Sequence, residues 1–458
     1  MHPPRFSFYS KPSMKRFIIH TLGCKVNQYE SCQIEQWLRS HGFCPAAPGS
    51  PVDLAVINTC CVTRTAASKS RQAARKLRKQ YPSAILLITG CLPAGPLEET
   101  ADLPKTAVLA ADKNQLLDTL HSLFAQSNHI KPDETSKTTN SRKIKHKNDL
   151  CLQEFDSCDP FGPLQSFSGQ TRAFLKIQDG CDVWCTYCIV PKIRSRIWSK
   201  PLDVILEEAQ TLTAAGHKEI VLTGIFLGAW GRPTARRKYW DISQPNPLPS
   251  LLKQLLAIPN LIRLRLSSLE PADVTDELIE VYQQYPNLVP HLHLPLQSGS
   301  DAILKRMARQ YTSEEFLRIC RKLQERLDRP AITTDIIVGF PGETEEDFEK
   351  TVEICRQVGF AKMHIFPFSP RRGTAAARMK PPVPAGIIRR RAEKLQELDK
   401  ELQETFRRQF LGQTVRVILE QTNPPAGRCD RYFMVDCSAA KANSPLAAGQ
   451  VVYVTLTD

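Results

Sequence analysis

The sequence lacks the marks of a membrane or exported protein. None of its 458 residues fall in an apolar run of eighteen, so we expect no transmembrane helix and no membrane partner. The opening stretch, MHPPRFSFYSKPSMKRF, has no apolar centre of the kind that signal peptides carry. Periodic sequence begins just after Met14, which makes Met14 a candidate start alongside Met1. We therefore expect a cytoplasmic protein.

The sequence also has no convincing internal repeat, which argues against a solenoid or array. Its length predicts roughly two to four domains, and 42% apolar with 24% charged residues is typical of globular proteins. The formal net charge of +14 fits a nucleic-acid partner, through release of counterions from phosphates, about as well as it fits a solvated basic surface. Nothing in the composition demands more than a monomer.

Fifteen cysteines are spread over this large chain without an export signal, so a disulfide framework is not expected. Metal or catalytic roles are favoured for the cysteines that cluster.

The order of apolar and amphipathic segments predicts three domains. Strands at 16–21, 53–58 and 84–89 alternate with helical stretches at 27–40 and 63–80, which indicates a small parallel α/β domain. Residues 127–150 are polar and aperiodic and read as a linker or loop. Six further strand candidates then alternate with helices and predict a barrel or part of one: 173–177, 219–223, 262–267, 290–296, 332–338 and 361–366. A charged helix at 387–409 precedes three alternating strands, at 414–420, 431–437 and 451–457, which indicate a small antiparallel β domain.

The segment GCDVWCTYC (180–188) holds three cysteines, Cys181, Cys185 and Cys188, with no histidine and no fourth cysteine beside them. Structural zinc sites close with four ligands, and a cubane iron–sulfur cluster usually takes four cysteines. Three thiolates would leave one iron open for a small molecule. The spacing is too tight for three helical residues on one face, so a loop must wrap the metal. The alternative is a zinc site that borrows a distant ligand.

This loop resembles that of radical S-adenosylmethionine (SAM) enzymes. The resemblance implies that the open iron binds the amino and carboxylate groups of SAM, and that Tyr187 packs near the adenine. The protein would supply binding and electrostatics, while cluster and SAM supply a 5′-deoxyadenosyl radical that removes hydrogen from unactivated carbon.

Four later segments follow successive predicted strands, at the end of the barrel where sites form. Taken singly, each reads as a turn after a strand. Together they predict SAM-binding positions in LTGIFLG (222–228), SSLEP (267–271), LPLQSGS (294–300) and TTDIIVGFPGET (333–344), namely Gly224, Ser268, Glu270, Gln297 and Asp335.

The N-terminal domain repeats the pattern of a cysteine directly after a strand. Cys24, Cys60 and Cys91 each hold this position. Because the carboxyl ends of parallel strands share one edge of the sheet, these three thiols could converge on a second cluster with an open site. The alternative is three small apolar cysteines in turns.

Over nearly its whole length the sequence resembles the methylthiotransferases, through TLGCKVNQYES (21–31), the NTC and GC motifs, HLHLPLQSGSDAILKRMARQYT (291–312) and HIFPFSPRRGTAAA (364–377). LGCKVNQYE and GIFLG are most similar to the subgroup that acts on threonylcarbamoyladenosine in tRNA. The sequence departs from the pattern at Cys61, which could compete with Cys60 as a ligand, at Phe226, where a histidine is common, and at Ser195, where glycine is usual.

The resemblance implies a fold and a set of cofactors. We expect a flavodoxin-like three-layer α/β domain (14–126), a linker (127–166), a radical SAM partial (β/α)6 barrel (167–405) and an antiparallel TRAM domain (406–458). Two [4Fe–4S] clusters and SAM are the implied cofactors. The implied metal ligands are Cys24, Cys60, Cys91, Cys181, Cys185 and Cys188.

The resemblance also implies the activity and the partners. One SAM would methylate a sulfur held on the N-terminal cluster, and a second would give the radical that removes hydrogen from adenine C2 at position 37, next to the tRNA anticodon. A low-potential electron donor must supply the electron. Two related reactions remain alternatives, on isopentenyladenosine in tRNA or on an aspartate of a ribosomal protein. An inactive RNA-binding relative is the alternative of another class.

The C-terminal domain and the helix before it would bind RNA. Tyr432 and Phe433 are candidates for stacking on bases, and the basic candidates are Arg389, Arg390, Arg391, Arg407, Arg408, Arg416, Arg428 and Arg431. The linker cations Arg142, Lys143, Lys145 and Lys147 are further candidates for phosphate contacts. The alternative in each case is a solvated basic surface over core aromatics.

Overall fold

The computed structural model describes residues 15–96, 100–128, 159–241, 243–438, 440 and 445–457. Met14 and residues 129–158 of the predicted linker, with its four cations, lie outside the described residues. In the part of the chain that is described, no helix is both long enough and apolar enough to cross a membrane.

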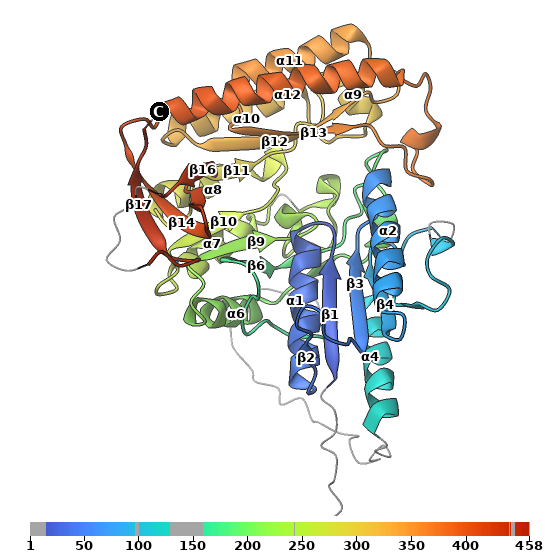
Figure 1. Ribbon diagram of the computed structural model, residues 1–458. Helices are drawn as coiled ribbons and strands as arrows, with labels where there is room; N and C mark the ends of the chain where they lie inside the picture. The colour runs from blue at the N-terminus through green and yellow to red at the C-terminus, as the bar shows by residue number, and fades with distance from the viewer. Residues whose placement is uncertain are drawn as a thin grey trace, which may run out of the picture.

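The N-terminal domain is a five-stranded parallel sheet in the order β2-β1-β3-β4-β5 (Figure 1). Its strands are β1 (Arg16–Thr21), β2 (Cys44–Pro45), β3 (Leu54–Thr59), β4 (Ile85–Gly90) and β5 (Val108–Leu109). Helices α1 (Lys25–Ser40) and α4 (Lys113–Asn128) pack on one face of the sheet, and α2 (Arg64–Gln80) packs on the other. These are the three layers that the sequence predicts.

The central domain is an open barrel of six parallel strands. Three form one sheet in the order β10-β9-β6, and three form a second in the order β11-β12-β13. Single parallel bridges from Leu264 to Leu288 and from Ser268 to His293 join the two sheets. The strands are β6 (Arg172–Lys176), β9 (Glu219–Thr223), β10 (Arg263–Leu266), β11 (His291–His293), β12 (Ala331–Val338) and β13 (Lys362–Pro367).

Helices cover the outside of the barrel and bury the apolar face of each strand. The barrel helices are α6 (Leu202–Ala214), α7 (Pro247–Leu256), α8 (Asp276–Gln284), α9 (Asp301–Arg306), α10 (Ser313–Arg326), α11 (Glu345–Val358) and α12 (Ala385–Arg408). A short ribbon of β7 (Gln178–Asp179) and β8 (Trp198–Ser199) brackets the cysteine loop and helix α5 (Val190–Ile193).

The C-terminal domain is a four-stranded antiparallel sheet in the order β16-β15-β14-β17. Its strands are β14 (Thr414–Thr422), β15 (Pro425–Cys429), β16 (Met434–Asp436) and β17 (Val451–Thr455). The fold class expected from the sequence, an α/β chain with a parallel barrel and a small C-terminal β domain, is confirmed. Strand β15 was not expected, because its sequence PAGRC has no alternation of apolar residues.

The first domain packs directly against the barrel, beside β6 and α6 (Figure 1). The hydroxyl of Tyr29 on α1 donates a hydrogen bond to Glu208 on α6 at 2.7 Å. Lys200 forms a short ion pair with the same carboxylate and lies near the Tyr29 hydroxyl, at 2.9 Å. This buried contact fixes one domain against the other.

Candidate functional site

Three cysteines converge at the carboxyl edge of the N-terminal sheet. Cys24 follows β1 and precedes α1, Cys60 follows β3, and Cys91 follows β4. Their thiols influence one another, since Cys24 and Cys60 both raise the pKa of the Cys91 thiol. Burial is the largest cause of that shift and raises it to about 12. A Cβ atom on Gly23 would lie 2.9 Å from the Cβ of Cys60, so the turn before Cys24 brings the two strand ends close together.

Cys61 points away from this group. Its thiol is fully buried and donates a hydrogen bond to the backbone oxygen of Cys91 at 3.1 Å. The side chain lies in the apolar core between the sheet and α2. The half-buried Cys60 is therefore the better placed of the two to bind a metal, as the sequence motif predicts.

The second group, Cys181, Cys185 and Cys188, lies on a loop between β7 and α5. Gly180 has φ +81°, and a Cβ there would lie 1.9 Å from the Arg196 carbonyl, so the loop entry requires glycine. Burial, together with the smaller effect of Cys185, raises the pKa of both Cys181 and Cys188 to about 12.

When buried thiols lie close together, their negatively charged thiolate forms repel one another. A bound metal cation stabilises the thiolates, so such a group binds a cation well. All thiols in the described residues are free of disulfides. Each group offers three sulfur donors, although among the described residues only His293, Asp335 and His364 bring three possible ligand atoms within 4.8 Å of one another. The donor sets fit two clusters that each keep one iron open.

Arg309 contacts the second cysteine group and was not predicted from the sequence. Its guanidinium donates a hydrogen bond to the Sγ of Cys185 at 3.3 Å and two to the carboxylate of Glu270 at 2.5 and 2.6 Å. Glu270 is therefore near the cysteine loop, as expected for a cofactor contact. Its carboxylate, however, is already engaged by Arg309, which favours an indirect role.

The other predicted SAM-binding residues lie along the same strand ends. Tyr187 packs against a small apolar cluster that contains Phe340, and Ile337 of β12 packs against the same cluster. Gly224 follows β9, where a Cβ would come within 3.0 Å of the Gln178 Cβ, so close packing of two strand ends accounts for this glycine. Ser268 is exposed beside His293.

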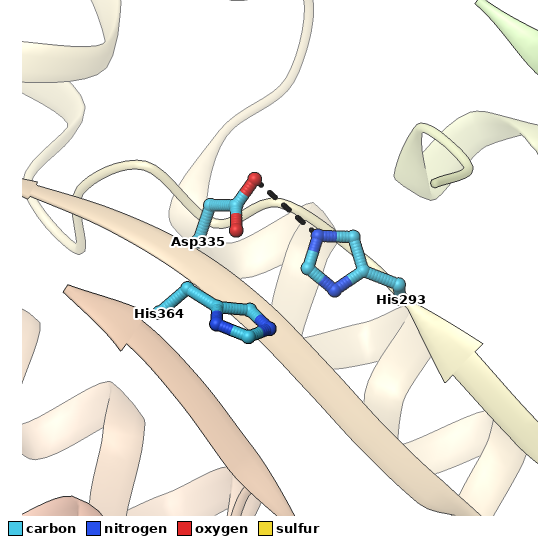
Figure 2. A group of neighbouring side chains, drawn as sticks. All are labelled: His293, Asp335 and His364. Carbon is cyan, nitrogen blue, oxygen red and sulfur yellow. Dashed lines mark ion pairs between the residues drawn. The ribbon is translucent and has the colours of Figure 1, made fainter. Parts of the chain in front are cut away.

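Gln297 has a left-handed backbone with φ +63° and is buried. Its backbone N–H donates to the Asp335 carbonyl at 2.8 Å, which ties this strand end to β12. Left-handed non-glycine residues are costly and gather at functional sites. Asp335 itself forms an ion pair with His293 at 3.3 Å, and His364 lies beside both (Figure 2).

Arg194 connects the two cysteine groups. It follows α5 in the barrel domain and binds Asp179, while both of its terminal nitrogens donate to Glu30 on α1 at 2.9 Å. Burial alone would raise the pKa of Glu30, but Arg194 and Lys176 lower it to about 2. Arg194 also lies close enough to lower the pKa of the Cys91 thiol against the larger effect of burial, so one buried cation reaches from the barrel to the first cysteine group.

Two further features join the domains at this edge. The backbone N–H of Arg64, at the start of α2, donates to the Ser369 hydroxyl at 3.0 Å, and Arg371 of the same barrel segment acts on Cys60. A cavity of about 640 Å³ lies between the domains, with Cys91 and Arg194 in its wall. Of the six cysteines, only Cys91 lines this cavity, so the cavity reaches the first cysteine group and not the second.

The C-terminal sheet corrects the expectation for base-stacking residues. Tyr432 is stacked on His291 of β11 with ring centroids 4.2 Å apart, and Phe433 packs on Phe406 and Phe410. Both half-buried rings are thus engaged in packing within the chain. Local sequence could not reveal this, because the partners lie in distant segments.

Most of the proposed basic contacts are also used within the chain. Arg391, Arg408, Arg416, Arg428 and Arg431 form ion pairs, and Arg407 donates to the Thr457 carbonyl. Arg389 and Arg390 are exposed on α12 and remain candidates for phosphate contacts.

Comparison with known families matches two parts of the chain. Residues 175–355 match the radical SAM superfamily, and residues 16–110 match the uncharacterized protein family UPF0004. Among solved structures, the radical SAM methyltransferase TsrM from Kitasatospora setae has a TM-score of 0.50 at 13% identity, covering 79% of this chain and 74% of that one. This likeness shows the fold.

Several curated proteins are similar over most of their length. The threonylcarbamoyladenosine tRNA methylthiotransferase MtaB of Thermotoga maritima is 36% identical, covering 89% of this chain and 87% of the relative. MtaB of Bacillus subtilis is 35% identical, with 92% and 90% covered. The tRNA-2-methylthio-N(6)-dimethylallyladenosine synthase of Zymomonas mobilis is 34% identical, with 98% and 96% covered.

Proposed function

The chain belongs to the radical SAM methylthiotransferase family, and we propose that it adds a methylthio group to C2 of N6-threonylcarbamoyladenosine at position 37 of tRNA. Radical SAM methylthiotransferases bind SAM and [4Fe–4S] clusters. Its relatives are tRNA-modifying enzymes, which supports tRNA as the substrate class and a cytoplasmic location. We place threonylcarbamoyladenosine first among the candidate substrates because two relatives named for it are 36% and 35% identical to this chain.

The observation that supports this proposal most is the presence of two three-cysteine groups, one in each of two domains that pack directly against each other. Transfer of a methylthio group needs a sulfur donor and a means of activating a C–H bond. A single open cluster could serve only one of these needs. Arg194, which binds Glu30 of one domain and Asp179 of the other, holds the two groups in a fixed relation.

In this proposal Cys24, Cys60 and Cys91 hold the sulfur-bearing cluster, and Cys181, Cys185 and Cys188 hold the cluster that binds SAM. When bound, the second cluster and SAM supply the radical that activates the C–H bond. The chain's residues bind and orient. Arg309 offers a positive charge to Cys185, Tyr187 closes the apolar wall, and Gln297 and Ser268 line the strand ends.

Isopentenyladenosine is the second candidate substrate. The observation in its favour is the 34% identity to the dimethylallyladenosine synthase of Zymomonas mobilis, which covers 98% of this chain. The identity to the two kinds of relative differs too little to decide between them.

Mass spectrometry of tRNA nucleosides from cells with and without the gene tests the proposal. We expect loss of the methylthio form of threonylcarbamoyladenosine and accumulation of its parent. A plasmid-borne wild-type gene should restore the product, and the Cys185→Ala variant should not. Loss of methylthio-isopentenyladenosine instead would establish the second candidate, and an unchanged nucleoside profile would contradict both.

A further inference from the structure

Three polar side chains gather midway along the inner wall of the barrel. His293 ends β11, Asp335 is in β12 and His364 is in β13 (Figure 2). Asp335 and His364 are direct neighbours across the parallel pair β12 and β13. Nitrogen or oxygen atoms of all three lie within 4.8 Å of one another. We call these residues the His–Asp–His group.

Strand alternation places this group on the lumen side of the barrel. Ile332, Ile336 and Val338 of β12 pack into the core under the helices, so Asp335 and Ile337 face the other way. Ile337 and Tyr187 of the cysteine loop pack against the same small apolar cluster, which contains Phe340. Asp335 lies two residues before Ile337, about 7 Å along the strand. The group is therefore one side-chain layer from the wall that closes on the cofactor.

The opposite end of the lumen is closed by the C-terminal domain. Tyr432 stacks on His291, which lies two residues before His293 on the same strand face. The cations Arg265, Lys25 and Arg172 act on His291 from this side. At His364 itself burial is the largest cause that lowers the pKa, and the nearby charges are mixed: Asp335 and Asp399 raise this pKa, while Lys362 lowers it.

The group has hydrogen-bonding capacity that the described residues leave unused. His293 Nδ1 lies 3.0 Å from the Thr333 hydroxyl, which holds Nε2 toward Asp335. His293 is the only described side chain that pairs with the Asp335 carboxylate. His364 makes no hydrogen bond to another described residue. Burial lowers its pKa, so at neutral pH it offers one donor and one acceptor.

We propose that His293, Asp335 and His364 bind the polar substituent on N6 of the target adenosine. This inference rests on the proposed function, because the threonylcarbamoyl group carries a carboxylate, a hydroxyl and a urea-like amide. Imidazole N–H groups would donate to the carboxylate, and the Asp335 carboxylate would accept from the hydroxyl or amide. This role competes with the SAM contact predicted for Asp335 from the sequence.

The group would then select against isopentenyladenosine. A hydrocarbon placed against half-buried imidazoles and a carboxylate would strip them of water and leave their donors and acceptors unpaired. Sites built for hydrogen bonds reject analogues that lack the partner far more strongly than apolar pockets reject an added polar group.

The test measures the affinity of the anaerobic, cluster-loaded enzyme for anticodon stem-loop RNAs that differ only at A37. The RNAs carry threonylcarbamoyl, isopentenyl or no substituent. His364→Phe and His293→Phe keep ring size and remove both nitrogens. His121→Phe, at an exposed histidine of α4, is the matched control. Asp335→Asn is a second, isosteric variant, and iron content with circular dichroism reports whether each variant folds.

We expect the wild type and His121→Phe to prefer the threonylcarbamoyl RNA over the unmodified RNA by at least about tenfold, and the histidine variants to retain about twofold or less. Affinity for unmodified RNA should stay the same.

If folded variants keep the full preference, the inference is wrong while the proposed function stands. If the wild type prefers isopentenyl RNA and methylthiolates it, the proposed function fails as well. If the wild type binds a divalent metal ion that the variants lose, the group is a metal site and the inference is overturned.

Discussion

At the scale of single residues, Arg309 shows how a side chain outside the cysteine motif can shape a cluster site. The guanidinium is buried against the Cys185 Sγ and the Glu270 carboxylate. A fixed positive charge beside a cluster favours its reduced, more negative form. Arg309 would therefore make the cluster easier to reduce.

Arg309→Gln should lower the midpoint potential of the cluster held by Cys185. The glutamine removes the positive charge and leaves Glu270 without its partner, and both changes disfavour added negative charge. Arg309→Lys keeps the positive charge but lacks the planar guanidinium with its several N–H donors, so it should give a smaller shift in midpoint potential. An anaerobic redox titration followed by electron paramagnetic resonance measures both. An unchanged potential in a variant of full iron content would show that Arg309 does not act on the cluster.

The choice between Cys60 and Cys61 is also a residue-scale question. Cys60→Ser should lower iron by about four of about eight atoms per chain, because one cluster loses a ligand. Cys61→Ser should keep its iron and lose about 1 kcal/mol of stability, because a hydroxyl replaces a thiol in the apolar core. Iron and sulfide assays on both variants decide the assignment. The reverse pattern would make Cys61 the ligand.

At the scale of elements, two arginines of β10 fasten the C-terminal sheet to the barrel. Arg263 and Arg265 are fully buried and share the Glu219 carboxylate. Arg263 also donates to the carbonyls of Arg416 and Arg428 at 2.5 and 2.9 Å. The sheet is therefore held by backbone oxygens as well as by apolar packing.

Arg263→Met should loosen this attachment by about 3 kcal/mol, because it removes one of the two arginines that pair with Asp430 and the side-chain donor to two carbonyls. Limited proteolysis should then cut near the end of α12 faster than in the wild type. The matched control is Arg389→Met on the exposed face of α12, which should not change the rate. Equal rates for the two variants would mean that the apolar core alone holds the sheet.

Elements differ in how far local sequence predicts them. β3, β4 and β9 are apolar runs that are buried on both faces, whereas β1 is only partly buried. The bounds of all four strands were predicted within one residue. β15 could not be predicted, since it is a strand only because it pairs with β14 and β16. At Gly427 a Cβ would lie 2.0 Å from the Ile418 carbonyl, so the pairing needs a residue that β propensity disfavours.

Residues of the candidate site also differ in whether local sequence predicts them. The cysteine ligands could be predicted because metal binding requires either a short spacing between cysteines or a position directly after a strand. Both features can be recognised in the sequence. Arg194, Arg309 and His364 could not, because each acquires its role from a residue far away in sequence, such as Glu30 for Arg194. The stacking of Tyr432 on His291 could not be predicted for the same reason, since His291 is distant in the sequence.

At the scale of the whole molecule, the net charge of +14 gives a prediction for the tRNA complex. Binding that depends on phosphate contacts releases counterions and weakens as salt rises. We expect tRNA affinity to fall by at least about tenfold between about 50 and about 200 mM salt. Filter binding or fluorescence anisotropy over a salt series measures this. A flat salt dependence would indicate that the basic surface does not contact the RNA.

The central claim is that the two cysteine groups hold separate clusters that act in one reaction. The most direct test measures 5′-deoxyadenosine and methylthiolated threonylcarbamoyladenosine together, in anaerobic reactions of wild type, Cys60→Ala and Cys185→Ala with tRNA and a low-potential reductant. The account predicts that Cys60→Ala still cleaves SAM but makes no methylthio product, and that Cys185→Ala does neither. Methylthio product from the Cys60→Ala enzyme, or SAM cleavage by the Cys185→Ala enzyme, would contradict it.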